Sequence, residues 1–528
     1  KNDKGTLISN NSNYKSIIKG ITHIKNISLL TIEGSGMIGI PGYLKKLFEE
    51  ISNNNINIIM ITQASSEHSI CIAINESDSI NAKKIIDEAF KYEIENSILS
   101  PSKIESKLSI IALVGDNMRD HQGISGKMFS ALGKNNINVK AISQGSSERN
   151  ITAVIKNNDV KKALNTLHEK FFEKNVKQIN LFIIGIGNVG SKLIDQIEKQ
   201  TDYLTKKLKL KLRIIAISNS KKMLFDESGL TLSNLKEDID NGENSNLDEF
   251  FKKINKLNLR NSVFIDNTAS SKIAGLYQNF LKNNISVVTC NKIACSDSYS
   301  SYIELKKLAS KYDTSFLYET NVGAGLPIID TLNNLINSGD KINSIQAVLS
   351  GSLNYIFNNF NNSNTFEDVV KEAMDKGFTE PDPKIDLSGI DVARKILILA
   401  RESGNKIELN DITNKSFLPK ESLNTKDNKE FLKSLSENKD HFETILNDAY
   451  IKDCKIKYVA EYKNGKASVG IKNIPKDHDF YNLEGSDNIV LFYTDRYKQQ
   501  PLIVKGAGAG ADVTAAGIFA DIIRTSKR

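Results

Sequence analysis

The sequence lacks the features that define several large classes of protein. Its 528 residues contain only four cysteines and no Cys-x-x-Cys pair, which argues against a secreted disulfide framework and favours a reducing, cytoplasmic setting. No apolar run approaches the roughly 20 residues that a membrane-spanning helix needs, and the first residues do not form a signal peptide. We therefore expect no association with a membrane.

The excess of charge of one sign is also small. Lys and Arg number 70 against 63 Asp and Glu, which gives a net charge of +7, and no long basic block concentrates it. Binding to nucleic acid is therefore not expected. The hydrophobic content of 40% and the charged content of 25% are typical of a folded protein. At about 150 residues per domain, the chain should hold three or four domains.

An internal repeat occupies the first third of the chain. The segment 54–70 recurs as 135–151, and the offset between Gln63 and Gln144 is 144 − 63 = 81 residues. Each copy reads as strand, Gly-rich turn, helix, strand, polar turn, strand and helix, an order that predicts a small βαββαβ sandwich. The strands are expected at 27–33, 69–74, 108–114 and 151–155.

The two copies resemble ACT domains, regulatory modules that bind amino acids. The segments Ile61–Glu67 and Ile142–Glu148 are similar to the effector segments of aspartokinase regulatory domains. Gln63 and Gln144 each supply an amide that can recognise a free amino acid, and the resemblance implies L-threonine as the effector. For a single copy, a Gln-x-Ser-Ser turn that only caps structure is the simpler interpretation. Its recurrence in the same context favours a ligand site.

A glycine-rich turn in the middle of the chain carries the fingerprint of a dinucleotide site. A buried-strand pattern at 178–184 precedes it, and a helical pattern over 191–200 follows it. In this context the glycines allow a tight turn, close approach of a pyrophosphate and helix packing. A turn without a ligand is the alternative interpretation. The residues of the turn are Gly185, Ile186, Gly187, Asn188, Val189 and Gly190.

The end of the next strand bears on the choice of cofactor. That strand, 212–217, leads into Ser218 and the polar segment 219–222, which contains no acidic residue. An NAD-selective site usually places a carboxylate there to bind the ribose 2′-hydroxyl. We therefore expect NADP, with NAD still open. Further cofactor contacts are expected at the ends of the following strands, from Thr268, Ser270 and Lys292.

The densest cluster of ionisable residues lies downstream of the dinucleotide motif and holds four carboxylates next to two prolines. The prolines predict an extended segment over 380–384, and Ser388 or Gly389 can start a helix that places Asp391 and Lys395 on one face. An isolated pair of this kind is an ordinary surface ion pair, worth about 0.3–0.5 kcal/mol. Its neighbours favour a catalytic role.

This cluster, together with the segments 316–327, 349–353 and 505–514, resembles homoserine dehydrogenase from about residue 178 to the C-terminus. With the ACT pair in front, the chain is similar to the regulatory and dehydrogenase portions of bifunctional aspartokinase/homoserine dehydrogenases. The resemblance implies NAD(P)-dependent interconversion of L-homoserine and L-aspartate 4-semialdehyde in threonine and methionine biosynthesis. It also implies a homo-oligomer, either a dimer or a tetramer.

The resemblance further implies roles for individual residues. All six histidines lie outside the motifs, so lysine is left as the proton-transfer group. The catalytic residues implied are Lys395 for proton transfer, Lys292 beside cofactor and substrate, and Asp391. The substrate-binding residues implied are Glu380, Asp386 and Asp391, and Gly377 and Gly510 are expected to approach the cofactor. A monovalent cation, Na⁺, is implied near Glu319, Val322, Ala324 and Leu326.

These motifs predict tandem ferredoxin-like ACT domains, a Rossmann-type doubly wound nucleotide domain and an α+β catalytic domain. The expected boundaries are 1–20 for the end of an aspartokinase domain, 21–103 and 104–176 for the ACT domains, 177–318 for the nucleotide domain, 319–504 for the catalytic and dimerisation domain, and 505–528 for a segment that returns to the nucleotide domain.

Two further expectations concern the complete protein and an alternative function. The chain starts at Lys1 and not at Met, so we expect an aspartokinase domain upstream; no kinase-type Lys-Phe-Gly-Gly segment occurs in the chain itself. The alternative function is a non-catalytic amino-acid sensor that retains a degenerate dehydrogenase as a scaffold. The presence of both Lys395 and Glu380 argues against that alternative.

Overall fold

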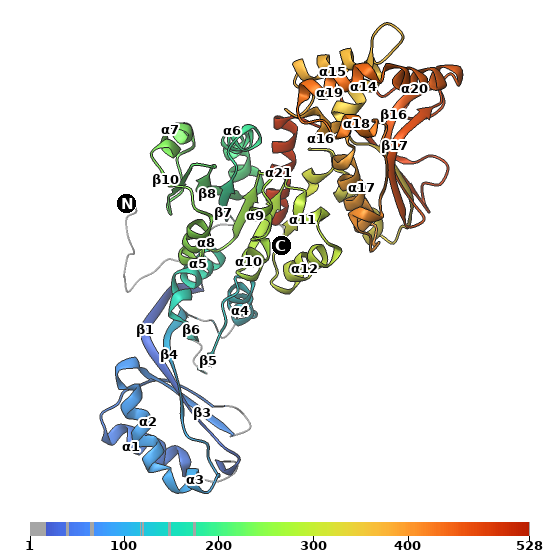
Figure 1. Ribbon diagram of the computed structural model, residues 1–528. Helices are drawn as coiled ribbons and strands as arrows, with labels where there is room; N and C mark the ends of the chain where they lie inside the picture. The colour runs from blue at the N-terminus through green and yellow to red at the C-terminus, as the bar shows by residue number, and fades with distance from the viewer. Residues whose placement is uncertain are drawn as a thin grey trace. The chain divides into compact units, whose positions relative to one another are not determined.

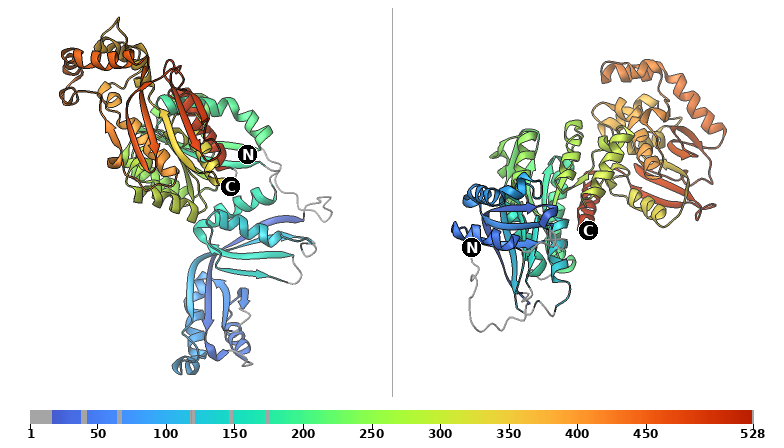
Figure 2. Two further views of the ribbon diagram at one scale, coloured as in Figure 1. Left: turned by 90° about the vertical axis from the view of Figure 1, so that its right-hand side faces the viewer. Right: turned by 90° about the horizontal axis from the view of Figure 1, so that it is seen from below.

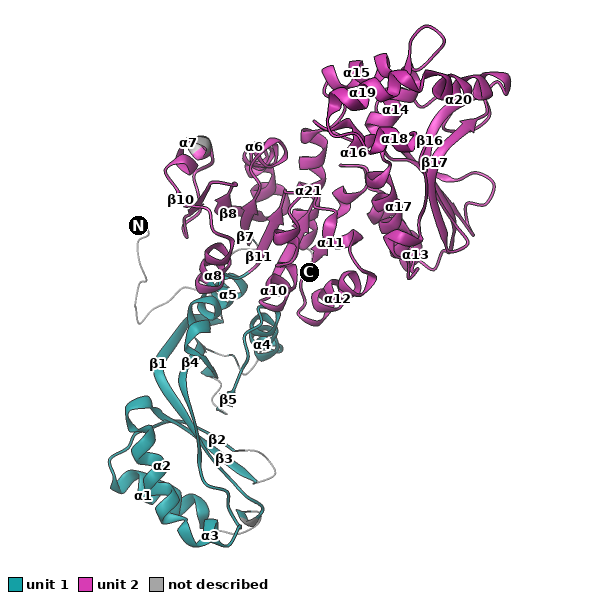
Figure 3. Cartoon of the chain, in the orientation of Figure 1, with its two compact units in different colours: residues 1–176, 258–260 teal, residues 177–257, 261–528 magenta. Residues whose placement is uncertain are grey.

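The chain folds into two compact units, shown in a computed structural model (Figure 1). They comprise residues 1–176 with 258–260, and residues 177–257 with 261–528 (Figure 3). The expected end of an aspartokinase domain falls largely outside the described residues, as do the Ser-Ser-Glu segments that follow Gln63 and Gln144. The structure describes residues 17–37, 42–63, 68–116, 118, 121–145, 149–172 and 176–526.

The first unit is built on one antiparallel sheet that both repeats share. Over the residues described, it has six strands in the order β2-β3-β1-β4-β6-β5. The strands are β1 (Ile18–Glu33), β2 (Ile58–Gln63), β3 (Ser69–Asn75), β4 (Lys103–Gly115), β5 (Ala141–Gln144) and β6 (Asn150–Lys156). The helices are α1 (Tyr43–Asn53), α2 (Ser79–Ala89), α3 (Lys91–Glu95), α4 (Ile124–Lys134) and α5 (Val160–Phe171).

The long strands β1 and β4 run through both lobes of this unit. The second half of β1 pairs with β3, whereas Ile18–Ile24 pairs with Ile110–Gly115 in β4. The register shifts between the two halves, close to Asn26, whose φ is 58°. The second repeat therefore completes its four-stranded sheet with the start of β1 and not with a strand after α5.

Alternation of side chains along the strands gives the sheet two apolar faces. On one face, Leu30 and Ile32 of β1 are buried under α1 and α2, and Ile111 and Leu113 of β4 are buried under α4 and α5. The opposite face has its own buried cluster, which draws on both lobes and so joins them. Its members are Ile27, Leu29, Met60, Ala73, Leu108, Ile110 and Val154.

The second unit begins with a mostly parallel sheet. Between residues 177 and 317 its strands follow the order β10-β9-β8-β7-β11-β12-β13, with β9 and β10 antiparallel. The strands are β7 (Lys177–Ile184), β8 (Leu210–Ser218), β9 (Lys222–Phe225), β10 (Glu243–Asn244), β11 (Ser262–Asp266), β12 (Ile285–Thr289) and β13 (Phe316–Leu317). Because β7 lies between β8 and β11, the strand order reverses there, as in a doubly wound fold.

Helices on this sheet and a third sheet complete the second unit. The first helices are α6 (Asn188–Tyr203), α7 (Leu235–Asp240), α8 (Leu247–Leu257), α9 (Ser271–Ala274), α10 (Tyr277–Lys282), α11 (Ile293–Ser296) and α12 (Tyr299–Lys311). The third sheet has the order β15-β17-β16-β14-β18-β19. Its strands are β14 (Ile342–Val348), β15 (Thr413–Lys415), β16 (Lys455–Lys463), β17 (Lys466–Ile474), β18 (Asp487–Thr494) and β19 (Leu502–Ala507).

The helices beside this third sheet carry most of the ionisable cluster predicted from the sequence. They are α13 (Ile328–Asn337), α14 (Gly351–Asn359), α15 (Phe366–Asp375), α16 (Pro383–Leu387), α17 (Ile390–Glu402), α18 (Lys420–Leu423), α19 (Asn428–Glu437) and α20 (Lys439–Ile451). Among the described residues, none of the helices combines the length and the apolar character needed to span a bilayer.

The last helix, α21 (Ala511–Thr525), returns to the nucleotide-binding sheet. Ile518 and Ile522 of α21 are buried in one cluster with Leu193 and Ile197 of α6. Figure 2 shows the dark red helix beside the green strands of that sheet. The nucleotide-binding part is therefore completed by residues more than 300 positions downstream of its first strand.

The substitution Ile518→Ala should destabilise the second unit. The side chain is fully buried, and removing such a group costs about 2–5 kcal/mol because a cavity remains. Calorimetry should show the melting transition of this unit shifted to lower temperature. Ile503→Ala is the matched control, because Ile503 is 43% exposed on β19; equal melting temperatures for the two variants would contradict the packing described.

Candidate active site

The glycine-rich turn after β7 has the geometry of a phosphate-binding turn. Gly185 has a φ of 89°, and a Cβ at Gly190 would overlap the carbonyl oxygen of Gly185. At Gly187, by contrast, a Cβ would meet nothing within 4 Å. The helix α6 begins at Asn188, three residues before the Ser191 start expected from the sequence, so the end of the motif forms its first turn. The turn thus leaves open space at a helix N-terminus.

The residues of this turn separate into a partly buried pair and an exposed pair. Ile186 and Val189 pack against the hydrophobic core below the sheet, whereas Gly187 and Asn188 between them are exposed. The apolar pair anchors the turn, and the exposed pair presents backbone to a ligand. This arrangement fits the pyrophosphate of a dinucleotide, which binds chiefly to backbone N–H groups.

The segment after β11 lies against the same turn. The Asn267 amide donates a hydrogen bond to the carbonyl oxygen of Gly185 at 3.2 Å, and the Thr268 methyl group would be 2.9 Å from a Cβ at Gly185. The Thr268 hydroxyl accepts a hydrogen bond from the Ser270 N–H at 3.1 Å. Thr268 and Ser270 therefore lie next to the glycine turn, where the sequence predicted cofactor contacts.

Ser218, at the end of β8, was expected to contact the cofactor, but its side chain is buried. Its side chain is 1% exposed, and its hydroxyl donates to the carbonyl oxygens of Asn219 and Lys222 at 3.1 and 3.2 Å. The hydroxyl group thus stabilises the β8–β9 turn from inside. Ser220 and Lys221 are the exposed residues that this turn offers to a ligand.

The buried carboxylate of Asp266, the last residue of β11, forms hydrogen bonds that stabilise the chain after β12. Asp266 accepts hydrogen bonds from the Tyr277 hydroxyl at 2.6 Å and from the Asn291 amide at 3.0 Å. Burial raises the pKa of Asp266 above its usual value, against these hydrogen bonds. The Asn291 amide also donates to the carbonyl oxygen of Ser270 at 3.0 Å. These bonds fix the backbone position of Lys292, the next residue in the chain.

The centre of the site is a carboxylate held between two lysines. Asp391 Oδ2 lies 2.9 Å from Lys395 Nζ, and Asp391 Oδ1 lies 3.4 Å from Lys292 Nζ. Burial alone would raise the pKa of Asp391, but the two ammonium groups outweigh it and hold the pKa below the usual range. Lys395 also donates to the carbonyl oxygen of Leu349 at 2.7 Å. Two lysines about 100 residues apart are thus joined through one carboxylate.

The start of α17 explains why Asp391 and Lys395 lie there. Gly389 has a φ of 72°, and a Cβ at this position would overlap the Tyr458 hydroxyl, so only glycine is tolerated. The helix begins at the next residue, Ile390, which confirms the predicted start. One helical turn then separates Asp391 from Lys395 on a shared face.

The segment before α17 corrects one expectation. The sequence predicted an extended chain over 380–384, but α16 begins at Pro383. Proline is favoured at the first position of a helix because its φ is already helical and its missing N–H is not needed there. Asp382 stabilises this start, since its side chain accepts a hydrogen bond from the Lys384 N–H at 3.1 Å.

Asp386 connects this segment to α14. Its carboxylate accepts hydrogen bonds from the Glu380 N–H at 2.8 Å and from the Ser352 hydroxyl at 2.9 Å. Burial raises the pKa of Asp386, with the charge of Asp391 as a further contribution in the same direction. The Glu380 side chain is exposed. Asp386 therefore positions the backbone of Glu380, whose carboxylate faces solvent.

Two other glycines predicted to approach the cofactor lie at helix ends. Gly377 follows α15 with a φ of 71°, and Gly510 precedes α21 with a φ of 125°. Both values favour glycine because a Cβ would be strained there. Their placement is thus explained by the helix boundaries, and their contact with a cofactor stays a prediction.

The residues predicted to surround a cation form a tight turn. Glu319 is buried, and its carboxylate accepts hydrogen bonds from the N–H groups of Ile329 at 2.7 Å and Asp330 at 2.9 Å. Arg524 lies 3.1 Å from the same carboxylate. The Glu319 side chain is therefore engaged by the start of α13 and by α21. Burial raises its pKa against the effect of Arg524.

The rest of the turn contributes backbone. Val322 and Ala324 are buried, Leu326 is half-buried, and Ala324 has a φ of 53°. Within the residues that the structure describes, no group of three or more His, Cys, Asp or Glu side chains could hold a metal ion. A cation at this turn would therefore depend on carbonyl oxygens.

In the first unit, the two candidate effector residues occupy equivalent positions. Gln63 ends β2 and pairs with Ile70, and Gln144 ends β5 and pairs with Ile151. Both glutamine side chains are exposed. The Ser125 hydroxyl donates a hydrogen bond to the Gln144 side-chain oxygen at 3.0 Å. The sequence repeat thus corresponds to a structural repeat at these residues.

Some contributors to the site carry no sequence signal. Leu349 acts through its carbonyl oxygen, which any residue type would supply. Asn291 and Asp266 act on Lys292 through hydrogen bonds between strands distant in sequence. In the sequence, the only indication of a role for Asn291 and Asp266 was their position in polar segments at the ends of predicted strands.

Comparison with known proteins agrees with this geometry. Residues 185–319 match the family described as homoserine dehydrogenase, NAD binding domain, and residues 327–523 match homoserine dehydrogenase. Residues 30–90 and 111–171 match the ACT domain. The two ACT matches start 111 − 30 = 81 residues apart, the period of the repeat.

Relatives of known name extend the likeness over the chain. The chain is 40% identical to the bifunctional aspartokinase/homoserine dehydrogenase of Haemophilus influenzae, over 99% of this chain and 64% of that protein. It is 36% identical to the homoserine dehydrogenase of Schizosaccharomyces pombe, over 66% of this chain and 95% of that protein. A solved structure of a hyperthermophilic archaeal homoserine dehydrogenase in complex with NADPH matches with a TM-score of 0.53 and 25% identity, over 66% of this chain and 98% of that one.

The fold and the site together define an NAD(P)-dependent oxidoreductase that carries regulatory ACT domains. The family matches cover the dinucleotide turn, the segment that carries Asp391 and Lys395, and both ACT repeats. The chain belongs to the homoserine dehydrogenase family. It spans 64% of the length of the Haemophilus influenzae relative.

The glycines of the turn should respond differently to alanine. In Gly190→Ala the new methyl group must displace the Gly185 carbonyl, so both the melting temperature and the affinity for NADPH should fall. In Gly187→Ala the methyl group has free space, so the melting temperature should stay unchanged while NADPH binds more weakly. Calorimetric titration and melting curves measure both quantities. Normal NADPH affinity in both variants would argue against this turn as the pyrophosphate site.

Proposed function

We propose that the chain catalyses the NAD(P)-dependent interconversion of L-homoserine and L-aspartate 4-semialdehyde. The observation that carries this proposal is the Asp391 carboxylate between Lys395 and Lys292, beside the ends of the nucleotide-binding strands. A bound dinucleotide would accept or supply the hydride. The chain itself must then bind the amino acid and move one proton.

Lys395 is the proton-transfer residue of this proposal. An ammonium group has three N–H donors, and those of Lys395 include one directed at Asp391 and one at the Leu349 carbonyl oxygen. The third is left for the substrate oxygen. In the direction of reduction, this ammonium gives a proton to the aldehyde oxygen as hydride reaches the carbon. In the direction of oxidation, the neutral amine takes the proton from the alcohol.

Two further carboxylates suit the ammonium group of the substrate. Glu380 is exposed, and the Asp386 carboxylate accepts a hydrogen bond from its N–H. Asp386 itself lies within electrostatic range of Asp391 and Lys395. A free ammonium group needs acceptors of negative charge. Glu380 would therefore bind the substrate, with Asp386 supporting it and Lys292 balancing the charge of Asp391.

For the cofactor we propose NADP over NAD. The exposed Ser220 and Lys221 at the end of β8 can bind a 2′-phosphate, and the segment holds no carboxylate to repel it. For the cation we propose Na⁺ held by carbonyl oxygens of Glu319, Val322, Ala324 and Leu326, because the Glu319 side chain is already engaged. Both proposals concern residues of the second unit.

The decisive variant is Lys395→Met. It keeps the length of the side chain and removes the amino group that accepts the proton. Oxidation of L-homoserine with NADP⁺ should therefore slow by about 10²–10⁴-fold. NADPH binding should persist. Lys433→Met is the control, since Lys433 belongs to an exposed ion pair on α19. A wild type without turnover, or a Lys395→Met variant with full turnover, would reject the assignment; threonine binding without turnover would favour the sensor alternative.

We further propose that the ACT pair binds L-threonine at two related sites. The support is the equivalent position of Gln63 and Gln144 at the exposed ends of β2 and β5. A side-chain amide offers a donor and an acceptor to a free amino acid. Binding there would act on the enzyme as an allosteric signal.

The variants Gln63→Ala and Gln144→Ala test this proposal. Each should weaken threonine binding and raise the threonine concentration needed for half-maximal inhibition, with uninhibited turnover unchanged. Isothermal titration and the homoserine assay measure the two effects. Unchanged binding in Gln144→Ala would show that the second site is misassigned, and a variant of exposed Ile80 in α2 provides the control.

Three wider expectations complete the proposed function. We propose a homo-oligomer, either a dimer or a tetramer, and an aspartokinase domain preceding this chain in the complete protein. The second follows the name of the Haemophilus influenzae relative, of which the chain covers 64%. For location we propose the cytoplasm, since all four cysteines are free thiols.

A further inference from the structure

The segment that carries Glu380 has few backbone donors before the first turn of α16. Pro381 and Pro383 lack N–H groups, so only the N–H groups of Glu380 and Asp382 are available over residues 380–383. The Glu380 N–H is bound by Asp386 at 2.8 Å. After residues 380–382, which we call the Glu380 turn, the chain enters α16, where Pro383 and Leu387 are buried. The stretch also contacts a second segment, from Thr425 to the start of α19.

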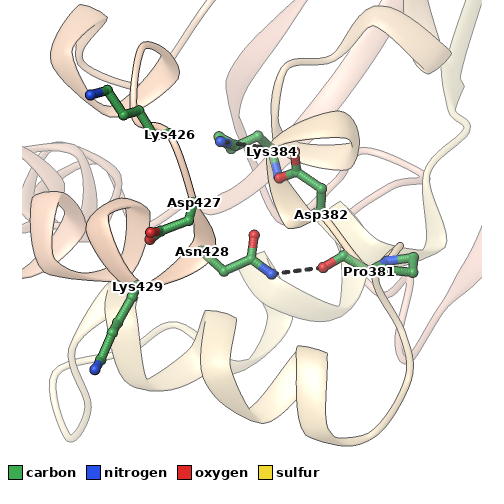
Figure 4. Close-up of a pocket in the computed structure, with 7 residues that line it drawn as sticks. All are labelled: Pro381, Asp382, Lys384, Lys426, Asp427, Asn428 and Lys429. Atoms are coloured by element: carbon green, nitrogen blue, oxygen red, sulfur yellow. Dashed lines mark hydrogen bonds and ion pairs between the residues drawn. The ribbon is translucent and has the colours of Figure 1, made fainter.

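Two hydrogen bonds join these segments, and we call them the latch. The Asn428 side-chain amide donates to the Pro381 carbonyl oxygen at 2.8 Å, which Figure 4 shows as a dashed line. The Lys384 ammonium donates to the Thr425 carbonyl oxygen at 2.7 Å. The latch thus holds the Glu380 turn from both sides of Asp382.

A pocket of about 510 Å³ lies beside the latch. It is open to solvent, and the two bonds of the latch join the segments beside it. Lys395, Asp391 and Lys292 do not line it. The residues that do are Pro381, Asp382, Lys384, Lys426, Asp427, Asn428 and Lys429 (Figure 4).

The anchoring side of the latch is rigid. Asp427 caps α19, since its side chain accepts a hydrogen bond from the Glu430 N–H at 2.8 Å. Phe431 on the next turn of α19 is fully buried. Asn428 therefore extends from a fixed helix end, and the Glu380 turn is the part that would move if the latch were lost.

We propose that Asn428 and Lys384 are positioning residues that set the affinity for the amino-acid substrate by holding Glu380 in place. This inference rests on the proposed function, because Glu380 must bind the substrate ammonium group. Without the latch, the Glu380 carboxylate spends part of its time away from the substrate. The Lys-Asp-Lys cluster and the glycine turn do not share these contacts. Substrate binding should therefore weaken while proton transfer and cofactor binding stay intact.

The experiment compares steady-state kinetics of the full chain with L-homoserine and NADP⁺. In Asn428→Ala and in Lys384→Met, the KM for homoserine should rise about 3–10-fold, the effect of losing one hydrogen bond. The kcat should stay within about two-fold, and the KM for NADP⁺ should not change. Lys384→Arg should restore the KM, because arginine can still donate to the Thr425 carbonyl.

Lys429→Ala is the matched control. Lys429 lines the same pocket, yet its side chain forms no hydrogen bond or ion pair within the described part of the chain, so the kinetics of this variant should equal those of the wild type. Asn428→Asp, which keeps the shape and removes the donors, replaces Asn428→Ala if that variant melts at a lower temperature.

The double variant Asn428→Ala/Lys384→Met adds a second criterion. Because both bonds hold one turn, its KM should rise by less than the product of the two single effects. The proposal is overturned if the KM for homoserine in Asn428→Ala and Lys384→Met equals that of Lys429→Ala, or if the KM for NADP⁺ rises equally. A wild type that does not oxidise homoserine would instead reject the proposed function itself.

Discussion

The buried carboxylate of Glu402 is the interaction on which the active site most depends. Its side chain is 1% exposed at the end of α17, and it accepts hydrogen bonds from the hydroxyl groups of Tyr302 and Tyr318 and from Lys306 at 2.9 Å. A buried charge is tolerated only when it is fully partnered. Tyr302 and Lys306 belong to α12, and Tyr318 directly follows β13. The hydrogen bonds to Glu402 therefore join α17 to the nucleotide-binding sheet.

The neighbouring residue, Arg401, extends this junction to α11. Its guanidinium is buried and donates to the Cys295 carbonyl oxygen at 2.8 Å and to Glu408 at 2.8 Å. Since α11 starts directly after Lys292, the same junction connects α17, which carries Lys395, to the helix that follows Lys292. Asp391 lies 11 residues before Glu402, or about 16 Å along the helix. The junction at the far end of α17 therefore stabilises the orientation of the helix that carries Asp391.

The sequence predicted those parts of the site that depend on neighbours along the chain. The glycine turn and the shared face of Asp391 and Lys395 follow from local spacing, and both are present in the structure. The placement of Lys292 beside cofactor and substrate came only from family resemblance, and its ion pair with Asp391 was not predicted, because no local pattern joins residues so far apart. The extended segment over 380–384 was wrong because a proline favours an extended neighbour before it and a helix start at its own position equally well.

The fold shows the same division between local and distant information. The strands and the 81-residue period were visible in the sequence, and the family matches have that period too. The return of the last helix to the nucleotide domain was expected together with the family resemblance, whereas the pairing of Ile18–Ile24 with β4 was not predicted. Both involve partners far along the chain. Hydrophobic alternation indicates which face of a strand is buried, but not which strand lies beside it.

Because both repeats use strand β1, the pair of repeats, and not a single repeat, is the unit with a complete sheet. A fragment cut at the boundary of the repeats would lose Ile18–Ile24 and leave one edge of β4 without a partner. It would also uncover Ile111 and Leu113 near that edge, and an open apolar edge invites aggregation. Transferring this ACT pair to another protein would therefore require the whole segment from Ile18 to the end of α5.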